Sequence, residues 1–402
     1  MRGDMEFGTT VRDEGLRDAE RFVAAAHTSP QDWNAALDFV LKKIDQNLLP
    51  FRNTFPAPAS IGLVYPALPN TDWTSSFWTG MVWLAYERTG DPKYRESAEH
   101  QLASYRERVE KRIATETHDL GFLYTLSCVA AWRLTGNAEA KRVAVLAADL
   151  LLERYLSTAG IIQAWGDLTD MAQRGRMIID CCMNLPLLYW ATEVTGDPAY
   201  AAAARSHVVQ SARYLVRPDA STYHTYFMDV ATGAPRHGKT AQGYADDSCW
   251  ARGQAWAIYG LALSYRYTRD PALLALGKKV ANYFLNRLPE DGICYWDLVF
   301  TRGPEERDSS AAAITACGLL ELAGHLAPAD VLRRPYEQAA RFMVRSLADH
   351  YTSASQPASN GVLLHSVYNK PAKFGVDECT IWGDYYYMEA LIRLTTDWRV
   401  YW

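Results

Sequence analysis

Apolar and polar positions follow helical periodicity along most of the chain, and the alternation typical of strands is scarce. Strongly apolar segments, such as residues 122–132, are followed by amphipathic ones, such as residues 139–155. In the second of these, Val143, Leu146 and Leu150 share one face. An apolar helix is typical of a buried position and an amphipathic helix of a half-buried one. The pattern therefore predicts an all-α protein in which inner and outer helices alternate.

A recurring turn separates these segments. Thr-Gly-Asp-Pro stands at residues 89–92 and 195–198, with the variants Thr-Gly-Asn-Ala at 135–138 and Thr-Arg-Asp-Pro at 268–271. A degenerate copy lies within residues 322–330. Glycine just past a helix adopts the left-handed conformation, Asp or Asn caps the next helix, and Pro fits its first turn. Each turn is therefore predicted to end one helix and begin another.

The spacing of the turns places one residue of each apolar segment at a common level. Counting back fifteen or sixteen residues from the threonine of each full turn leads to Trp73, Asp119, Asp180 and Arg252. The degenerate turn leads near Asp308, and the last helix leads to residues 380–382. Sixteen residues form a helix about 24 Å long. We therefore expect six helical hairpins in an (α/α)6 toroid, with these six positions around a concave mouth at one end.

The first thirty residues differ from the rest, because they are polar and lack the apolar core of a secretory signal. We predict a polar N-terminal extension over residues 1–30 and a single catalytic domain over residues 31–402. No run of about 18 apolar residues occurs, so we expect no membrane-spanning helix.

Composition narrows the class of protein. The chain has 402 residues, 49% of them hydrophobic, which is enough for a large core. Its net charge of -5 does not favour a nucleic-acid partner. The seven cysteines show no CxxC spacing and indicate reduced thiols in a cytoplasmic protein rather than disulfides or a zinc site. The 13 Trp residues suit sugar binding as well as the core. A monomer and a dimer are both compatible with this composition.

Asp180 and Asp119 are the candidate catalytic residues. The apolar neighbours of Asp180, within residues 177–183, should raise its pKa, whereas a helix start should lower it. Either aspartate could instead be a helix cap. However, both occupy the same position of the repeat, and two coupled carboxylates are the usual equipment of glycosidic chemistry.

Arg252 and Trp256 lie four residues apart and so share one helix face. An arginine there could bind a substrate carboxylate, or it could pair with Asp246 or Asp247 as a structural ion pair. His224 is open to a core or surface role as well as a role in a site. The sequence contains no HExxH metal motif, glycine-rich phosphate loop or serine elbow, so we predict no metal and no cofactor.

Several segments, in consistent order over residues 35–397, resemble glycoside hydrolase family 88, the unsaturated glucuronyl hydrolases. The specific matches are Trp-Ala-Arg-Gly-Gln-Ala-Trp at residues 250–256 and His-Asp-Leu-Gly-Phe at residues 118–122. Further similar segments are Phe-Trp-Thr-Gly at 77–80, residues 177–187, Tyr-His at 223–224, Gln-Gly-Tyr at 242–244, Gly-Val-Asp-Glu at 375–378 and Trp-Gly-Asp-Tyr at 382–385.

The resemblance implies the same toroid, no cofactor, and hydration of the C4=C5 double bond in an unsaturated uronic acid at the non-reducing end of lyase-generated oligosaccharides. It implies that Asp180 protonates C4 and then assists water at C5, while Asp119 is the second aspartate. It further implies that the sugar is bound by Trp73, His118, Trp165, His224, Gln242, Arg252 and Trp256.

The preferred substrate is predicted to be a glycosaminoglycan disaccharide. Family members that favour sulfated disaccharides carry serine and lysine near residues 366–370 and a basic residue near position 241. Ser366 and Lys370 are similar, whereas Asn369 and Ala241 depart from that pattern.

Three other functions remain open on the sequence. The related unsaturated rhamnogalacturonyl hydrolases, which act on pectin fragments, share the toroid and the chemistry. Sugar epimerases and isomerases on the same toroid rely on histidines, whereas carboxylates hold the central positions here. A glycan-binding protein without catalysis would have no need of paired aspartates.

Overall fold

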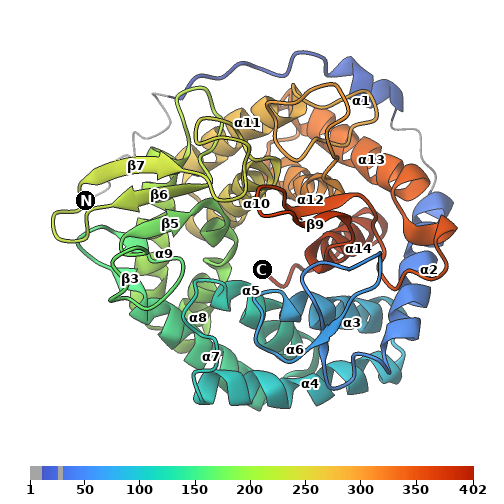
Figure 1. Ribbon diagram of the computed structural model, residues 1–402, viewed down its shortest axis with the longest axis horizontal. Coiled ribbons are helices and arrows are strands. Elements are labelled where there is room, and N and C mark those ends of the chain that lie inside the picture. The colour runs from blue at the N-terminus through green and yellow to red at the C-terminus, as the bar shows by residue number, and fades with distance from the viewer. Residues whose placement is uncertain (1–10, 26–29) are drawn as a thin grey trace.

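A computed structural model describes residues 11–25 and 30–402, and in that part of the chain twelve helical segments form two concentric rings (Figure 1). The inner ring consists of α3 (Ser75–Thr89), α5 (Leu120–Tyr124) with η2 (Thr125–Val129) and α6 (Ala130–Thr135), η3 (Ile179–Met183) with α8 (Pro186–Thr195), α10 (Ala251–Thr268), α12 (Ser309–His325) and α14 (Ile381–Thr395). The outer ring consists of α2 (Pro30–Asn47), α4 (Pro92–Glu110), α7 (Ala138–Glu153), α9 (Pro198–Gln210), α11 (Pro271–Leu285) and α13 (Arg333–His350). The structure is an (α/α)6 toroid, and the predicted fold is confirmed.

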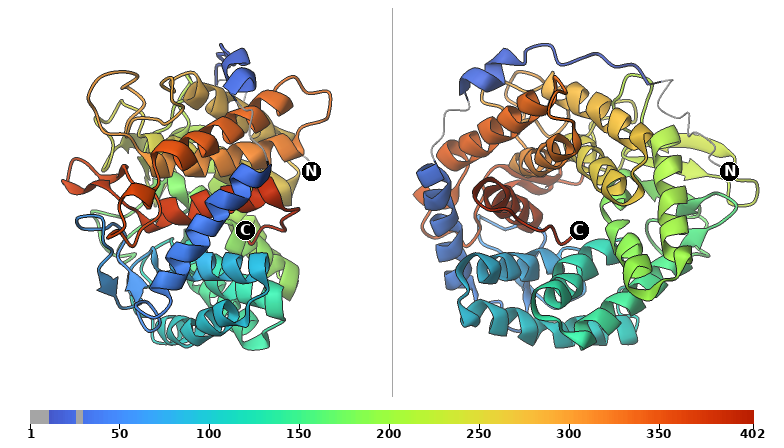
Figure 2. Two further views of the ribbon diagram at one scale, coloured as in Figure 1. Left: turned by 90° about the vertical axis from the view of Figure 1, so that its right-hand side faces the viewer. Right: turned by 180° about the vertical axis from the view of Figure 1, so that it is seen from behind.

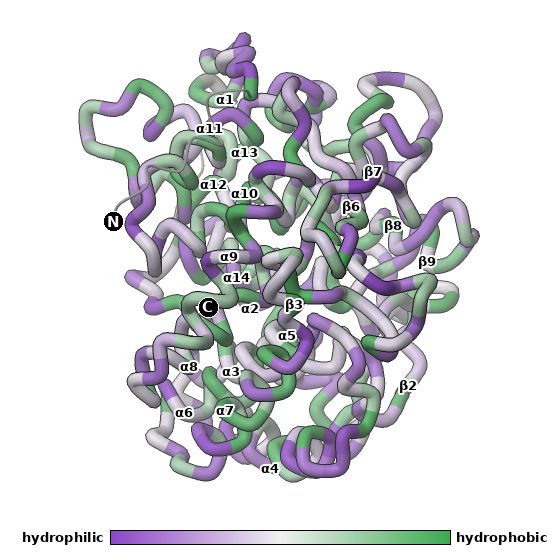
Figure 3. The backbone as a smooth tube through the Cα atoms, turned by 90° about the vertical axis from the view of Figure 1, so that its left-hand side faces the viewer, coloured by the Kyte–Doolittle hydropathy of each residue, from purple (hydrophilic) through white to green (hydrophobic). Residues whose placement is uncertain are grey.

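The ring closes between its two ends. The last inner helix, α14, packs against the first, α3, and the outer helix α2 lies against both (Figure 2). Burial follows the two rings as predicted. Helix α14 is buried on every side from Ile381 to Ile392, whereas α13 buries one face only. Hydrophilic stretches gather on α4 and on the outer loops (Figure 3).

The repeated turns have the predicted geometry. Gly90, Gly136 and Gly196 adopt the left-handed conformation at the ends of inner helices, and Arg269 takes that place with a φ of 55°. The side chains of Asp91, Asn137, Asp197 and Asp270 each accept a hydrogen bond from the first turn of the next helix. The degenerate copy differs, because Gly324 lies inside α12 and α13 begins only at Arg333.

The links from outer to inner helices are long, and they gather at the end of the toroid where the inner helices begin. We call this end the front face. Every strand of the described chain lies in such a link: β1 (Phe55–Pro56), β2 (Ala67–Leu68), β3 (Tyr155–Leu156), β4 (Ile161–Ile162), β5 (Arg176–Ile178), β6 (Thr225–Met228), β7 (Pro235–Lys239), β8 (Ser366–Asn369) and β9 (Phe374–Glu378). Strands β5, β6 and β7 form one antiparallel sheet, and β8 pairs with β9. The front face is therefore built from loops and short strands held by the helical rings.

Residues 11–25 of the predicted N-terminal extension lie against the outer ring. Glu14 forms an ion pair of 2.7 Å with Arg287 just beyond α11. Phe22, in the short helix α1 (Glu20–Ala25), is buried and packs on Phe342 of α13. Residues 1–10 and 26–29 of the predicted extension lie outside the described residues, and the domain boundary at residue 31 stays a prediction.

Aromatic side chains fill the back of the ring. After α14 ends, the chain turns back into the centre of the toroid (Figures 1 and 2). The indole of Trp402 is 1% exposed, stacks on Tyr386 at 6.0 Å and donates a hydrogen bond to Glu389. It also contacts Phe122 of α5 at 6.0 Å. None of the helices in the described part of the chain is long and apolar enough to cross a membrane.

The capped turns predict a measurable loss of stability in Asp197→Ala. The Asp197 side chain accepts a hydrogen bond of 2.8 Å from the Ala199 amide, and removal of such a cap costs about 1 kcal/mol. Urea unfolding should show this loss with unchanged activity, since the turn lies at the back. Asp38→Ala, on the exposed face of α2, is the control and should change the free energy of unfolding by less than about 0.5 kcal/mol. Equal effects of both substitutions would contradict the capping role.

Candidate active site

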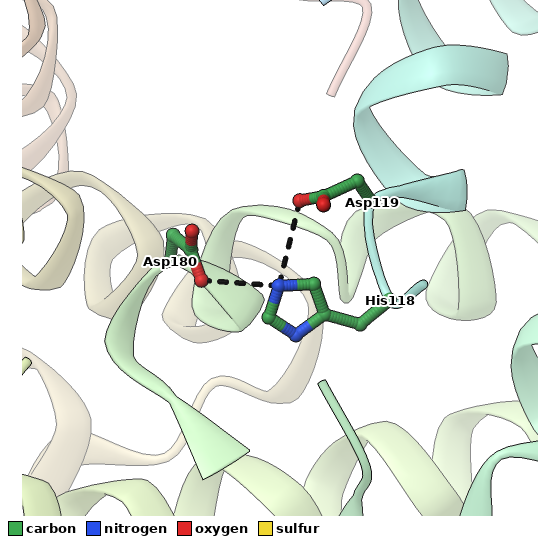
Figure 4. Close-up of side chains that lie close together, drawn as sticks. All are labelled: His118, Asp119 and Asp180. Carbon is green, nitrogen blue, oxygen red and sulfur yellow. Dashed lines mark ion pairs between the residues drawn. The ribbon is translucent and has the colours of Figure 1, made fainter. Parts of the chain in front are cut away.

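Three polar side chains meet at the front face. The Nε2 atom of His118 lies 3.4 Å from Oδ1 of Asp119 and 3.2 Å from Oδ1 of Asp180 (Figure 4). His118 is fully buried, and the side chains of Asp119 and Asp180 are 7% and 15% exposed. The structure thus brings together the two aspartates that share a position of the repeat and places one imidazole between them.

Local structure holds each group in place. Asp119 precedes α5, and its Oδ2 accepts a hydrogen bond of 2.6 Å from the hydroxyl of Thr117. Asp180 lies in η3, directly after strand β5. Neither carboxylate forms a side-chain cap on its helix, so the alternative interpretation of both residues as helix caps is wrong.

The distance between the two aspartates depends on Gly121 and Asn184. A Cβ atom on Gly121 would lie 2.3 Å from the backbone oxygen of Asn184, so only glycine allows this close approach. The Asn184 side chain accepts a hydrogen bond of 2.7 Å from the Phe122 amide and donates one of 3.3 Å to the Asp180 carbonyl. Asn184 therefore ties the start of α5 to the turn that carries Asp180.

The charges of the three groups are coupled. Burial disfavours the imidazolium, but Asp119 and Asp180 outweigh it and raise the pKa of His118 well above its usual value. Burial also acts to raise the pKa of Asp180, yet His118, with a smaller contribution from Arg252, holds that pKa below its usual value. Burial and the charge of Asp180 raise the pKa of Asp119 to about 6. The sequence indicated that burial would raise the pKa of Asp180 and that a helix start would lower it. The ion pair with His118, which decides the direction, was not predicted.

His224 is a neutral hydrogen-bond donor. Its Nδ1 accepts from the amides of Ala241 at 2.9 Å and Gln242 at 3.3 Å, which assigns the proton to Nε2. Burial lowers the pKa of His224 to about 3, so the ring stays uncharged at neutral pH. Its Nε2 is buried without a hydrogen-bond partner among the described residues. A substrate oxygen can therefore satisfy it.

Arg252 is held on several sides by protein groups. Its guanidinium donates to the Gln242 side chain at 2.6 Å and to the Tyr368 carbonyl at 2.8 Å. It also donates to the Val367 carbonyl and lies 3.4 Å from Asp308. The sequence analysis left open an ion pair of Arg252 with Asp246 or Asp247. Those partners are wrong, because Arg252 pairs with Asp308. Arg252 is 1% exposed and fixes Gln242 and the β8 strand.

The predicted aromatic residues differ in their surroundings. Trp73 stacks on Trp382 at 5.2 Å and donates a hydrogen bond to the Tyr368 hydroxyl. Trp256 is 1% exposed and packs at 5.3 Å on Phe122, three residues after Asp119 in the chain.

Trp165 borders the segment that carries His118 and Asp119. It is half-buried and lies 6.5 Å from His224, and its backbone pairs with that of Thr117, two residues before Asp119. Trp165 therefore lies close both to His224 and to the segment that leads to Asp119.

Ser366 and Lys370 both have protein partners. Ser366 is fully buried and its hydroxyl lies 2.8 Å from that of Ser309. The ammonium of Lys370 lies 2.8 Å from Glu305 and also pairs with Glu306. Two carboxylates thus offset the charge of Lys370.

Sequence reasoning missed Thr117, Asn184 and Arg176. Thr117 stands in the same motif as Asp119, so its hydroxyl could have been considered. Asn184 follows Asp180 by four residues, but its contact with Gly121 joins segments that are distant along the chain. Arg176 begins the strand that leads to Asp180 and contacts Trp165.

The cluster of His118, Asp119 and Asp180 also offers potential metal ligands. His118, Asp119 and Asp180 place ligand atoms within 4.8 Å of one another. However, the raised pKa of His118 favours an imidazolium, which has no free lone pair for a metal. That the site works without metal or other cofactor stays a prediction.

Comparisons with known proteins agree with this geometry. Residues 63–398 match the family model described as Glycosyl Hydrolase Family 88. The unsaturated chondroitin disaccharide hydrolase of Streptococcus pneumoniae is 46% identical over 98% of this chain and 99% of its own length. The crystal structure of unsaturated glucuronyl hydrolase from Streptococcus agalactiae superposes with a TM-score of 0.95, at 44% identity over 98% of this chain and 99% of that one. An aspartate-to-asparagine mutant from S. agalactiae, complexed with dGlcA-GalNAc6S, gives a TM-score of 0.88 at 42% identity, with 98% and 99% of the two chains covered.

The contact at Gly121 predicts a catalytic defect in Gly121→Ala. The added methyl group meets the backbone of Asn184, so Asp119 and Asp180 must separate. A displacement of about 1 Å at a site can lower the rate by about 100-fold. Steady-state kinetics should show a lower kcat, and thermal unfolding a lower midpoint.

Gly324→Ala is the control for this substitution. Gly324 is helical and a Cβ there meets nothing within 4 Å, so activity should be unchanged and stability equal or higher. Full activity of Gly121→Ala would show that the spacing of the aspartates does not depend on this contact.

Proposed function

The chain belongs to glycoside hydrolase family 88, and we propose that it releases unsaturated (4-deoxy-4,5-ene) glucuronic acid from the non-reducing end of lyase-generated oligosaccharides. The observation that carries the proposal is the buried imidazole of His118 shared between Asp119 and Asp180 at the front face. Such a cluster stores one proton among three groups, which suits a reaction that first gives a proton to carbon and later recovers one from water.

The reaction begins at the vinyl ether. A proton adds to C4, and the positive charge that forms at C5 is shared with the ring oxygen. Water then adds to C5 and gives up a proton, which leaves a hemiketal. The hemiketal opens by breaking the bond between C5 and the ring oxygen, and the resulting hemiacetal at C1 expels the rest of the glycan as an alcohol.

Asp180 acts as the acid and then as the base. It is the most exposed member of the cluster, so it is the one that a substrate can reach most directly. At rest it is an anion paired with the imidazolium of His118. An anionic substrate excludes water and adds negative charge, and both effects raise the pKa of Asp180. The proton then passes from His118 to Asp180 and on to C4, and Asp180 afterwards takes the proton that water loses.

Asp119 stabilises the cation that forms at C5. Its carboxylate lies in the same buried cluster, where charge interactions are stronger than in water. The Thr117 hydroxyl holds its outer oxygen in place.

The sugar-binding residues divide into direct and supporting groups. We assign His224 as a neutral donor to a substrate oxygen, and Trp73 and Trp165 as ring faces for the sugar. Gln242, Arg252 and Trp256 are assigned to support the site from its walls and floor.

We extend the proposal to glycosaminoglycan disaccharides, because two of the similar proteins are an unsaturated chondroitin disaccharide hydrolase and an enzyme complexed with dGlcA-GalNAc6S. Contacts of Ser366 and Lys370 with a sulfate stay a prediction. Location in the cytoplasm also stays a prediction and is supported by seven free, buried cysteines.

Loss of ultraviolet absorbance tests the activity directly, since the C4=C5 bond is conjugated with the carboxylate. The wild type should bleach unsaturated disaccharides from chondroitin or hyaluronan. Asp180→Asn should lower kcat by about 100- to 10,000-fold while still binding substrate, because it cannot donate a proton. Asp247→Asn, an exposed aspartate on a front-face loop, is the control and should keep full activity.

The outcomes separate the proposed functions. No bleaching of any unsaturated uronide would refute the hydration reaction. Faster turnover of unsaturated rhamnogalacturonan fragments would show that the protein is an unsaturated rhamnogalacturonyl hydrolase. An isomerised sugar without bleaching would show that it is an isomerase. A fully active Asp180→Asn would move the acid to another residue.

The coupled cluster predicts a bell-shaped dependence of kcat/KM on pH. Activity should fall as pH decreases through about 6, because Asp119 then takes up a proton and loses the charge that stabilises the cation. It should fall again at a pH well above the usual pKa of histidine, where His118 loses its proton. In Asp119→Asn the overall rate should be lower and the acidic limb absent. An unchanged acidic limb in that variant would assign it to another group.

A further inference from the structure

Arg176 is a half-buried cation at the front face without an acidic partner. Its guanidinium carbon lies 5.0 Å from the ring centre of Trp165 and 4.8 Å from that of Phe227. One terminal nitrogen donates to the Gln173 side chain at 2.6 Å. The Nε atom is buried without a hydrogen-bond partner, and no ion pair joins Arg176 to an acidic side chain of the described residues.

Arg108 and Arg154 are also buried without an ion pair in the described chain, but each donates three or more hydrogen bonds, to backbone carbonyls and in Arg108 also to Asn70. Two other buried arginines have acidic partners. Arg252 pairs with Asp308, and Arg393 pairs with both Glu321 and Glu389. For Arg176, burial alone acts on the pKa and lowers it, with no carboxylate to oppose the effect. Partial burial of an unpaired cation costs free energy, so such a group is expected to have a partner that is absent from the protein itself.

Arg176 is also tied to the catalytic residues by consecutive backbone hydrogen bonds. Its carbonyl accepts from the Ala164 amide at 2.9 Å, and the Ala164 carbonyl accepts from the His118 amide at 2.8 Å. Strand β5 begins at Arg176, and Asp180 follows four residues later in η3. The charge of Arg176 contributes to the low pKa of His224. An anion bound to Arg176 would therefore lie beside Trp165, on the side of the site where His224 lies.

We propose that Arg176 binds an anionic group of the substrate, either the carboxylate of the unsaturated uronate or a sulfate ester on the neighbouring sugar. The proposal rests on the proposed function. Both groups have the oxygen geometry that a guanidinium recognises, and the rings of Trp165 and Phe227 fix the plane of the guanidinium before substrate arrives. Arg252, whose donors are held by Gln242 and backbone carbonyls, is not the main cation for that group.

Arg176→Gln tests this role with unsaturated chondroitin disaccharides, one unsulfated and one carrying a 6-sulfate on the second sugar. We expect KM to rise by about tenfold or more for at least one of them, since hydrogen bonds to charged groups contribute about 1.5–3 kcal/mol, and kcat to change little. Arg176→Lys should recover part of the affinity, because it restores the charge without the planar fork. Arg174→Gln, two residues away and exposed, is the matched control and should leave both KM values unchanged.

The two substrates distinguish the two anions. An equal rise of KM for both indicates the carboxylate, and a rise confined to the sulfated disaccharide indicates the sulfate. Thermal unfolding separates binding from a structural role, because removal of an unpaired buried charge should leave the midpoint equal or higher. A lowered midpoint in Arg176→Gln, or KM values within twofold of the wild type for both substrates, would overturn the proposal. A wild type that bleaches neither substrate would refute the proposed function instead.

Discussion

The contact between Gly121 and the backbone of Asn184 sets the geometry on which the site depends. It brings the beginnings of two inner helical segments closer than any side chain would allow. Asp119 stands at one of these beginnings and Asp180 at the other, so one imidazole can reach both carboxylates. The rest of the toroid supports this approach, because the inner segments that carry Asp119 and Asp180 each end in a turn whose Asn or Asp caps the next outer helix.

The cluster of His118, Asp119 and Asp180 shows how a buried site can keep two carboxylates close together. Like charges in a low dielectric repel strongly, and each carboxylate also loses hydration. The imidazolium offsets one of the two negative charges and assigns unequal roles to the pair, with Asp180 charged and Asp119 poised near pH 6. A protein that needed stability alone would fill this position with apolar side chains.

Local signals in the sequence predicted most of the fold and part of the site. The turns at Gly90, Gly136 and Gly196 depend on neighbouring residues only, and from them the two-ring arrangement and the shared level of Asp119 and Asp180 could be predicted. Long-range contacts could not be predicted in this way. The partners of Arg252 come from Asp308 and the β8 strand, and those of Lys370 come from Glu305 and Glu306 in a separate loop.

Trp402 has a consequence for how a polymer meets this protein. Its indole stacks on Tyr386 and packs against Phe122, so buried aromatic side chains close the ring behind α5. A chain cannot thread through such a blind-ended site, so only a terminal residue can enter it. The enzyme is thereby restricted to exo action, one residue for each encounter.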